Sequence, residues 1–193
     1  MLKINGIDFD ELKKVLDPSI LDRSFNRALQ RTSEKTSVQI SKKVREIYLV
    51  KANRIKSALK ITNDDTGGNR AKVLTYTAMR IGLINFGPTA VVKIVGKNAR
   101  FGRKRVGVKV RIKKGKSPVL VKGAFFAVAA NGAGVKIFQR ERRTRKPLRI
   151  LKTLSIPQMI QRSDVIATAE TTSIEVFPKE MEVAVNFFAP KDG

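Results

Sequence analysis

The sequence predicts an α+β protein with a long N-terminal helix, a mainly antiparallel β-sheet of five to six strands with basic hairpins and loops, and C-terminal helices. Two observations lead to this prediction. Apolar and small residues recur at helical spacing over residues 19–59, and from residue 71 to residue 139 apolar residues follow a strand period of two. Helical and strand patterns that are segregated along a chain in this way are typical of the α+β class.

The long helix is predicted to begin at Asp17 and Pro18, because Asp is a good N-cap and Pro is tolerated at the first helical position. No Pro or Gly occurs in residues 19–59, so we expect one helix of about forty residues, with any bend near residues 32–37. A small domain cannot cover so long a helix, which must lie across a sheet or pack on a neighbouring chain. Its predicted buried face contains Leu21, Phe25, Ala28, Thr32, Thr36, Ile40, Val44, Ile47, Ile55 and Ala58.

A cluster of turn-forming residues at 63–69 separates this helix from the predicted sheet. In residues 106–112 the alternation is clear: Lys109 and Arg111 lie on one face of the strand and valines on the other, as in a half-buried antiparallel strand. Residues 113–118 then read as a basic hairpin tip. Residues 139–146 read as a loop, and Pro147 does not suit a central strand. The predicted strands are residues 71–79, 81–86, 90–95, 106–112, 119–128 and 135–139.

Helical segments close the chain. Ser155, Ile156 and Pro157 predict the start of a short helix, residues 163–176 a second, and residues 177–188 a third that restarts at Pro178. We therefore divide the sequence into an N-terminal arm and long helix (1–62), a sheet with basic loops (70–157) and a C-terminal helical segment (158–193). Together these three parts are expected to form one structural domain.

Composition argues against an enzyme. The 193 residues contain no Cys and no His, which removes thiolate metal sites, the usual zinc ligand and the commonest general base. Asp64 and Asp65 are read as turn formers, and Gly102, Gly107 and Gly115 are too far apart for a phosphate-binding loop. We expect no catalytic residue, no metal and no cofactor. No apolar run is long enough to span a membrane, so the chain reads as soluble and intracellular, with no membrane partner.

Positive charge is concentrated in residues 98–152, which contain eighteen Lys or Arg and one acid, Glu141, within a chain of formal net charge +24. A surface that is only solvated mixes both signs, so this bias indicates an anionic partner. Phe101 is the only aromatic residue in 100–116, which favours contact with the backbone of duplex DNA over base stacking. The candidate partner-binding or anion-binding residues are Arg100, Arg103, Lys104, Arg105, Lys113, Lys114, Lys116, Arg140, Arg142, Arg143, Arg145 and Lys146. Composition alone leaves duplex DNA and acidic protein faces open as the partner.

A series of short motifs resembles the minor tail protein Z family of tailed phages and prophages. A Leu-x-x-Phe element at residues 83–86 precedes Gly123-Ala124-Phe125-Phe126-Ala127, and Asn131-Gly132 follows. The series continues with Val135-Lys136-Ile137-Phe138-Gln139-Arg140, Arg145-Lys146-Pro147-Leu148 and Leu154-Ser155-Ile156-Pro157-Gln158-Met159. The resemblance spans about residues 19–159, from the long helix to the last motif.

The resemblance implies a virion structural protein at the head–tail joint or the tail end, made in the host cytoplasm, that acts as a tail-completion or neck component. The family is similar in fold to small α+β neck and tail-terminator proteins that form rings, usually hexamers. Partners implied in this way are further copies of the chain, adjacent tail tube, tail terminator or connector proteins, and genomic duplex DNA where loops face the channel. In this interpretation Pro147 and Pro157 form rigid turns, and Phe125 and Phe138 lie in the core. The alternatives are a non-sequence-specific duplex DNA-binding protein and a basic scaffolding or ribosome-associated protein.

Overall fold

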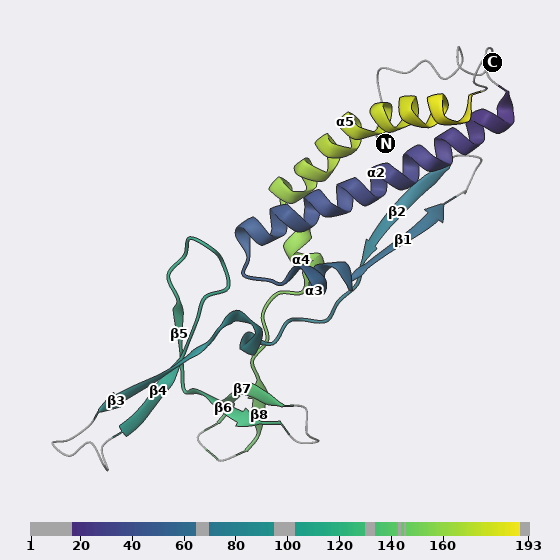
Figure 1. Cartoon of the computed structure of the whole chain (residues 1–193). Coiled ribbons are helices and arrows are strands. Elements are labelled where there is room, and N and C mark those ends of the chain that lie inside the picture. Colours follow the sequence, from purple (N-terminus) through teal and green to yellow (C-terminus); the bar gives the residue numbers. More distant parts are fainter. Residues whose placement is uncertain are drawn as a thin grey trace. The chain divides into compact units, whose positions relative to one another are not determined.

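The computed structural model describes residues 17–64, 70–94, 103–129, 134–142, 144 and 146–189, and for residues 93–94 and 103–105 it describes the backbone alone. The predicted N-terminal arm lies outside these residues. The described elements are α2 (Pro18–Ile47), α3 (Ala52–Lys56), β1 (Leu59–Asp64), β2 (Ala71–Tyr76), the 3-10 helix η2 (Leu83–Phe86), β3 (Thr89–Ile94), β4 (Arg103–Val110), β5 (Val119–Lys122), β6 (Ala124–Val128), β7 (Val135–Arg140), β8 (Leu148–Ile150), α4 (Ile156–Ile160) and α5 (Ser163–Phe188) (Figure 1).

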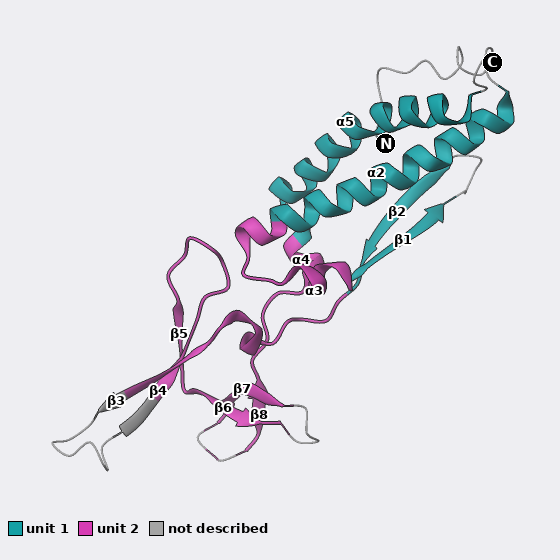
Figure 2. Cartoon of the chain, in the orientation of Figure 1, with its two compact units in different colours: residues 1–43, 58–77, 160–193 teal, residues 44–57, 78–159 magenta. Residues whose placement is uncertain are grey.

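The α+β class is confirmed, but the strands do not form one sheet. The described strands make three small antiparallel sheets, of order β1-β2, β3-β4-β5 and β6-β7-β8. The chain divides into two compact units (Figure 2). Unit 1 contains residues 1–43, 58–77 and 160–193, and unit 2 contains residues 44–57 and 78–159. The expectation of a single structural domain in three segments stays a prediction.

Helix α2 begins where the sequence predicts. The backbone N–H of Ser19 donates to Asp17 Oδ1 over 2.7 Å, and this bond caps the first turn. The same backbone donor is the main reason why the pKa of Asp17 lies below its usual value. The predicted helical face is largely confirmed, because its members Ala28, Thr32, Thr36, Ile40 and Val44 are buried.

The prediction of one forty-residue helix is wrong at its C-terminal end. Helix α2 ends at Ile47, and α3 follows as a separate five-residue helix. The chain leaves the helix because the backbone of residues 47–49 pairs with the segment that follows β4: Leu49 N donates to the Ile112 carbonyl over 2.9 Å, and Lys114 N donates to the Ile47 carbonyl over 2.8 Å. The aromatic, branched run that begins at Tyr48 suits this pairing better than a further helical turn.

In unit 1, helices α2 and α5 lie side by side (Figure 1). Phe25 meets Phe177 edge-to-face, with ring centroids 5.6 Å apart, next to Ala28 and Met181. Polar contacts flank this apolar cluster. Thr36 Oγ1 lies 3.2 Å from Ser173 Oγ.

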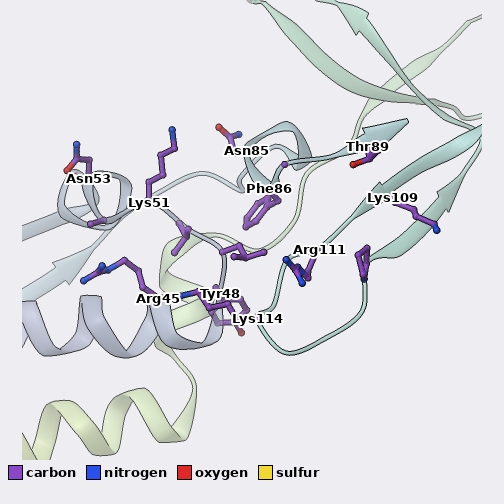
Figure 3. A pocket seen from close by; sticks show the side chains of 15 residues that line it. Arg45, Tyr48, Lys51, Asn53, Asn85, Phe86, Thr89, Lys109, Arg111 and Lys114 are labelled. Carbon is purple, nitrogen blue, oxygen red and sulfur yellow. The ribbon is translucent and has the colours of Figure 1, made fainter. Parts of the chain in front are cut away.

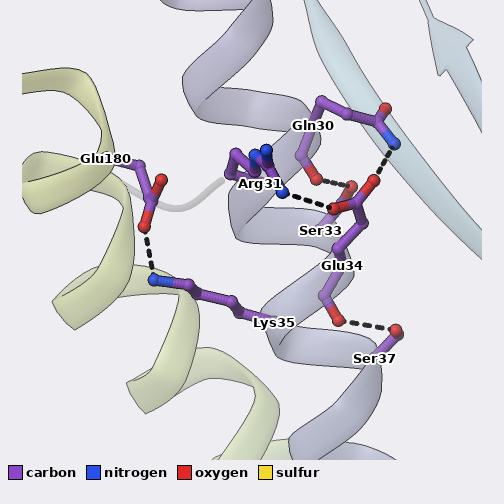
Figure 4. A network of polar contacts seen from close by, with 7 residues as sticks. All are labelled: Gln30, Arg31, Ser33, Glu34, Lys35, Ser37 and Glu180. Atoms are coloured by element: carbon purple, nitrogen blue, oxygen red, sulfur yellow. Dashed lines mark hydrogen bonds and ion pairs between the residues drawn. The ribbon is translucent and has the colours of Figure 1, made fainter. Parts of the chain in front are cut away.

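A network of polar contacts lies along α2 and reaches Glu180 of α5 (Figure 4). Lys35 forms an ion pair with Glu180 of α5. Glu34 accepts a hydrogen bond from Gln30 over 2.7 Å and forms an ion pair with Arg31 at 3.7 Å. Lys35, Glu34 and Glu180 therefore each have a partner of opposite charge within unit 1.

The C-terminal helix is continuous, so the predicted break near residue 177 is wrong. Helix α5 runs from Ser163 to Phe188 with Pro178 inside it. A proline in a helix interior loses one backbone hydrogen bond. The neighbouring side chains of Phe177 and Met181 are 2% and 1% exposed, and this packing offsets the lost bond and holds the helix together across Pro178.

Strand β1 was predicted as the end of the long helix and the start of a turn. It pairs antiparallel with β2, from Leu59 opposite Tyr76 to Asp64 opposite Ala71. Burial raises the pKa of Tyr76 to about 12, because the phenolate would lose solvation. The tip of this hairpin, at residues 65–69, lies outside the described residues.

Unit 2 contains the two three-stranded sheets and corrects three strand predictions. Residues 83–86 form η2 rather than a strand, and the predicted strand 119–128 divides into β5 and β6 at Gly123, whose φ of 71° is in the left-handed region. Strand β8 was not predicted, because the predicted loop covered residues 139–146 and residues 148–150 were assigned to no element. It lies at an edge of its sheet just after Pro147, where a proline is tolerated.

Other expectations for unit 2 are confirmed. Val108 and Val110 are 1% and 4% exposed, whereas Lys109 and Arg111 face solvent. Residues 113–118 form the turn between β4 and β5, with Gly115 at φ 71°. The short helix predicted at residue 156 is α4. Phe138 is buried as predicted, whereas Phe125, also predicted to lie in the core, is half-buried; the two rings stack with centroids 6.3 Å apart.

Candidate functional site

Unit 2 contains an open groove of about 990 Å³ (Figure 3). It lies where the chain leaving α2 passes η2 and the β4–β5 hairpin. The lining residues are Arg45, Tyr48, Leu49, Val50, Lys51, Ala52, Asn53, Asn85, Phe86, Gly87, Thr89, Lys109, Arg111, Lys114 and Pro118. We call this feature the basic groove.

Backbone pairing fixes the walls of the basic groove. An antiparallel bridge joins Tyr48 to Lys113, and the bonds from Leu49 to Ile112 and from Lys114 to Ile47 lie on either side of it. This pairing places the end of α2 against the beginning of the β4–β5 turn. Side chains distant in sequence therefore come to the rim of one groove.

The floor of the groove is apolar. Tyr48 and Phe86 are 2% and 5% exposed, and Leu49 and Val50 are half-buried. The ammonium of Lys113 lies 5.8 Å from the centroid of the Tyr48 ring, within cation–π range. The two rings are almost fully covered, so the half-buried Leu49 and Val50 supply apolar surface that a ligand can contact.

The rim of the groove is positively charged. No carboxylate is among its lining residues. Five cations line it: Arg45, Lys51, Lys109, Arg111 and Lys114. In the described part of the chain, Lys51, Lys109, Arg111 and Lys114 make no ion pair with an acid of this chain. The polar residue Asn85 is held by a 2.9 Å hydrogen bond from Arg54 and donates to the Gly82 carbonyl over 2.9 Å. An apolar floor beneath several cations suits a ligand that carries both carboxylates and apolar side chains.

The predicted site residues fall into separate places. Lys113, Lys114 and Lys116 lie in the β4–β5 turn and are exposed, and of these only Lys114 lines the basic groove. Arg103, Lys104 and Arg105 lie in β4, where their backbones pair with β3, and the structure describes only the backbone of these three residues. Their role in partner binding stays a prediction.

The second predicted cluster surrounds the β7–β8 connection. Arg140, Arg142 and Lys146 are exposed there, and Arg140 lines a different hollow, of about 460 Å³, with its guanidinium 5.8 Å from the Phe125 ring. Arg100, Arg143 and Arg145 lie outside the described residues.

Sequence reasoning missed four of the five groove cations as site residues. Arg45 and Lys51 were read as part of a continuous helix, and Lys109 and Arg111 only as the solvent face of a strand. The alternation of residues 106–112 did place Lys109 and Arg111 together. The run of aromatic and branched residues at 48–50 could have indicated that the helix ends there and that the chain then pairs with the strand at residues 106–112. That reading would have added Arg45 and Lys51 to the predicted site.

Two absences hold for the residues that the structure describes. In that part of the chain, no group of three or more acidic, His or Cys side chains is arranged to hold a metal ion. None of the helices there combines the length and the apolar character needed to cross a membrane.

Comparison with known proteins gives one family. The family model described as prophage minor tail protein Z matches residues 7–188, which is most of the chain. No curated protein matches the chain. No solved structure matches it either. The family match covers both compact units and includes every residue of the basic groove.

Proposed function

We propose, from the premise that this chain belongs to the prophage minor tail protein Z family, that it completes the phage tail as a ring at the head–tail junction or at the tail end. The observation that carries the proposal is the match over residues 7–188, because it includes the helices as well as the basic sheets. The chain then acts as a structural protein of the virion rather than as an enzyme. Its partners are further copies of itself and adjacent tail tube, tail terminator or connector proteins.

The charge distribution supports an assembly role. Residues 98–152 carry eighteen cations against one acid, and such a surface is stabilised when acidic neighbours lie against it. A ring repeats this positive surface once per subunit around its axis. The exposed cations of the β4–β5 turn and the β7–β8 connection are therefore the residues that we expect to meet acidic partners.

Deleting the gene from the prophage that encodes this chain should yield particles that fail to complete. We expect filled heads and separate tails, or tails of abnormal end structure, in electron micrographs, together with loss of infectious titre. The wild-type chain supplied in trans should restore both readouts. Normal joined particles at normal titre would remove the basis for a tail-completion role.

Duplex DNA remains the second candidate partner, because the same excess of cations suits phosphate contacts. Binding of the purified chain to random duplex DNA across a salt series tests it. Each phosphate neutralised changes log K by about −0.9 per unit of log salt. The structural proposal expects weak binding with a slope equivalent to a few phosphates. A slope equivalent to about six or more phosphates would make DNA the main partner instead.

A further inference from the structure

We infer that the basic groove of one copy binds the acidic N-terminal segment, residues 7–12, of a second copy of this chain. The inference rests on the proposed function, because it names a contact between subunits that the proposed ring would use. It commits to a short peptide segment as the occupant and to a second copy as its source. The segment precedes the part of the chain that the structure describes.

Residues 7–12 are the most acidic stretch of a very basic sequence. They read Ile-Asp-Phe-Asp-Glu-Leu and contain three of the sixteen acids and no cation. No other four consecutive residues of the sequence contain three acids. The family match begins at residue 7, so it includes this segment together with the groove. Within this chain the segment is therefore the densest source of carboxylates for a site lined by cations.

Several acids elsewhere already have partners within unit 1. Asp22 forms an ion pair with Arg70 at 2.8 Å, and Glu180 forms one with Lys35. The groove cations differ in this respect, because four of the five make no ion pair with an acid in the described part of the chain. The groove thus presents positive charge that a second copy can neutralise.

The spacing of the charges also matches. Lys109 and Arg111 are two residues apart and both are exposed on the solvent face of their strand. Residues two apart on one face of a strand are about 6.7 Å apart. Asp8 and Asp10 have the same separation in sequence, so an extended segment presents two carboxylates at the spacing of the two cations. Opposite charges that face each other in this way stabilise a pair of extended segments.

The apolar residues of the segment have a counterpart as well. Ile7 and Phe9 alternate with the two aspartates, so an extended segment places them on its other face. The half-buried Leu49 and Val50 supply the apolar surface of the groove. A phosphodiester backbone carries anions but no apolar side chains. The segment carries both, which favours it over a nucleic acid.

The length of α2 excludes the segment of the same chain. Arg45, the groove residue on this helix, is 27 residues after Pro18, which corresponds to about 40 Å of helix. Asp8 precedes Pro18 by ten residues, and these span at most about 36 Å when fully extended. Asp10 reaches less far still. Since a segment of one copy then meets a groove of the next, the interface is heterologous, the type that closes into a ring or extends into a chain of subunits.

Binding of a fluorescent peptide of residues 5–12 to the full-length protein tests the contact. The protein carries Asp8→Lys and Asp10→Lys, so that its own segments do not compete for the groove. Adding Lys109→Glu and Arg111→Glu should weaken binding of the peptide about tenfold or more at low salt, because carboxylates then face carboxylates. Fluorescence anisotropy measures this change.

The matched control adds Lys60→Glu and Arg80→Glu to the same parent. Both residues are exposed and lie outside the groove, and the pair changes the net charge as much as the groove substitutions do. The control should bind the peptide almost as tightly as the parent. The groove is rejected as the binding site if the parent does not bind the peptide, or if the control loses as much affinity as the groove variant.

Cysteine crosslinking shows which copy supplies the segment, because the chain has no cysteine of its own. Full-length chains with Lys51→Cys and with Glu11→Cys, mixed and oxidised, should give a disulfide heterodimer beyond the amount expected from random pairing. The double variant should give a ladder of multimers on non-reducing gels. Random pairing in the mixture, or a disulfide closed within one chain of the double variant, would overturn the inference.

These readouts separate the inference from the proposed function. The gene deletion measures particle completion and does not depend on which surfaces touch. Peptide binding and crosslinking of the purified chains measure the contact between groove and segment and do not depend on particles. An unjoined-tail phenotype without the heterodimer leaves the tail-completion role standing and rejects the groove contact, and the converse result does the opposite.

Discussion

Replacing Phe177 by alanine is expected to lower the free energy of unfolding by about 3–5 kcal/mol, the range typical of large aromatic truncations in a core. Phe177 is 2% exposed and lies at the centre of the α2–α5 seam, against Phe25, Ala28 and Met181. Leu21, Phe25 and Leu29 of α2 also pack on this cluster, and side chains around a truncated ring fill only part of the space that it leaves. The substitution also removes the edge-to-face contact with Phe25.

Urea unfolding followed by far-UV circular dichroism measures this loss as a lower midpoint at unchanged slope. Phe187→Ala on the same helix is the matched control. Phe187 is 61% exposed and contacts the Arg27 guanidinium, 4.1 Å from its ring centroid. Its truncation should cost only about 1 kcal/mol, because an exposed cation–π contact is worth little more than that. Equal midpoints for the two variants would mean that Phe177 is not a core residue.

The helices could be predicted from sequence because their signals are local. The Asp17 cap and the run of small and apolar residues identify the start and the buried face of α2. The end of α2 was missed, because its main cause is pairing between residues 47–49 and residues 112–114, which are far apart in the sequence, and the branched run at residues 48–50 is only a weak local signal for it. The continuity of α5 across Pro178 likewise depends on packing against α2, which no local rule reports.

The strands illustrate the same limit. Alternation identified β4 and its solvent face, because period two is a property of the strand itself. It could not assign strands to three separate sheets, since partner choice is a long-range property. The short strand β8 contains only three residues, too few to give a periodic signal.

For the candidate site, the sequence located the region of positive charge but not the groove. The predicted cations were chosen from local charge density, which favours turns such as residues 113–116. A groove is instead lined by residues that come from several helices, strands and loops. Of the predicted set only Lys114 meets this condition, and Arg45 joins it because α2 ends beside the β4–β5 turn.

Replacing Gly107 by alanine is expected to destabilise unit 2 by about 3 kcal/mol or more, beyond the usual cost of an added methyl group in a packed core. Gly107 lies in the central strand β4, opposite Val91 of β3 and Lys122 of β5. A Cβ atom there would lie 2.2 Å from the Val121 carbonyl oxygen and 3.0 Å from its carbonyl carbon. Both atoms are backbone, so strand β5 must move and its pairing with β4 must weaken.

Gly82→Ala is the control that separates this clash from the general effect of losing a glycine. Gly82 has φ −64°, which alanine adopts freely, and the nearest atoms to an added Cβ are side-chain atoms at 3.7 Å and 3.9 Å. Its stability should be unchanged or slightly raised, because alanine has less freedom in the unfolded chain. Wild-type stability of Gly107→Ala would show that β5 does not approach β4 as closely as the geometry requires.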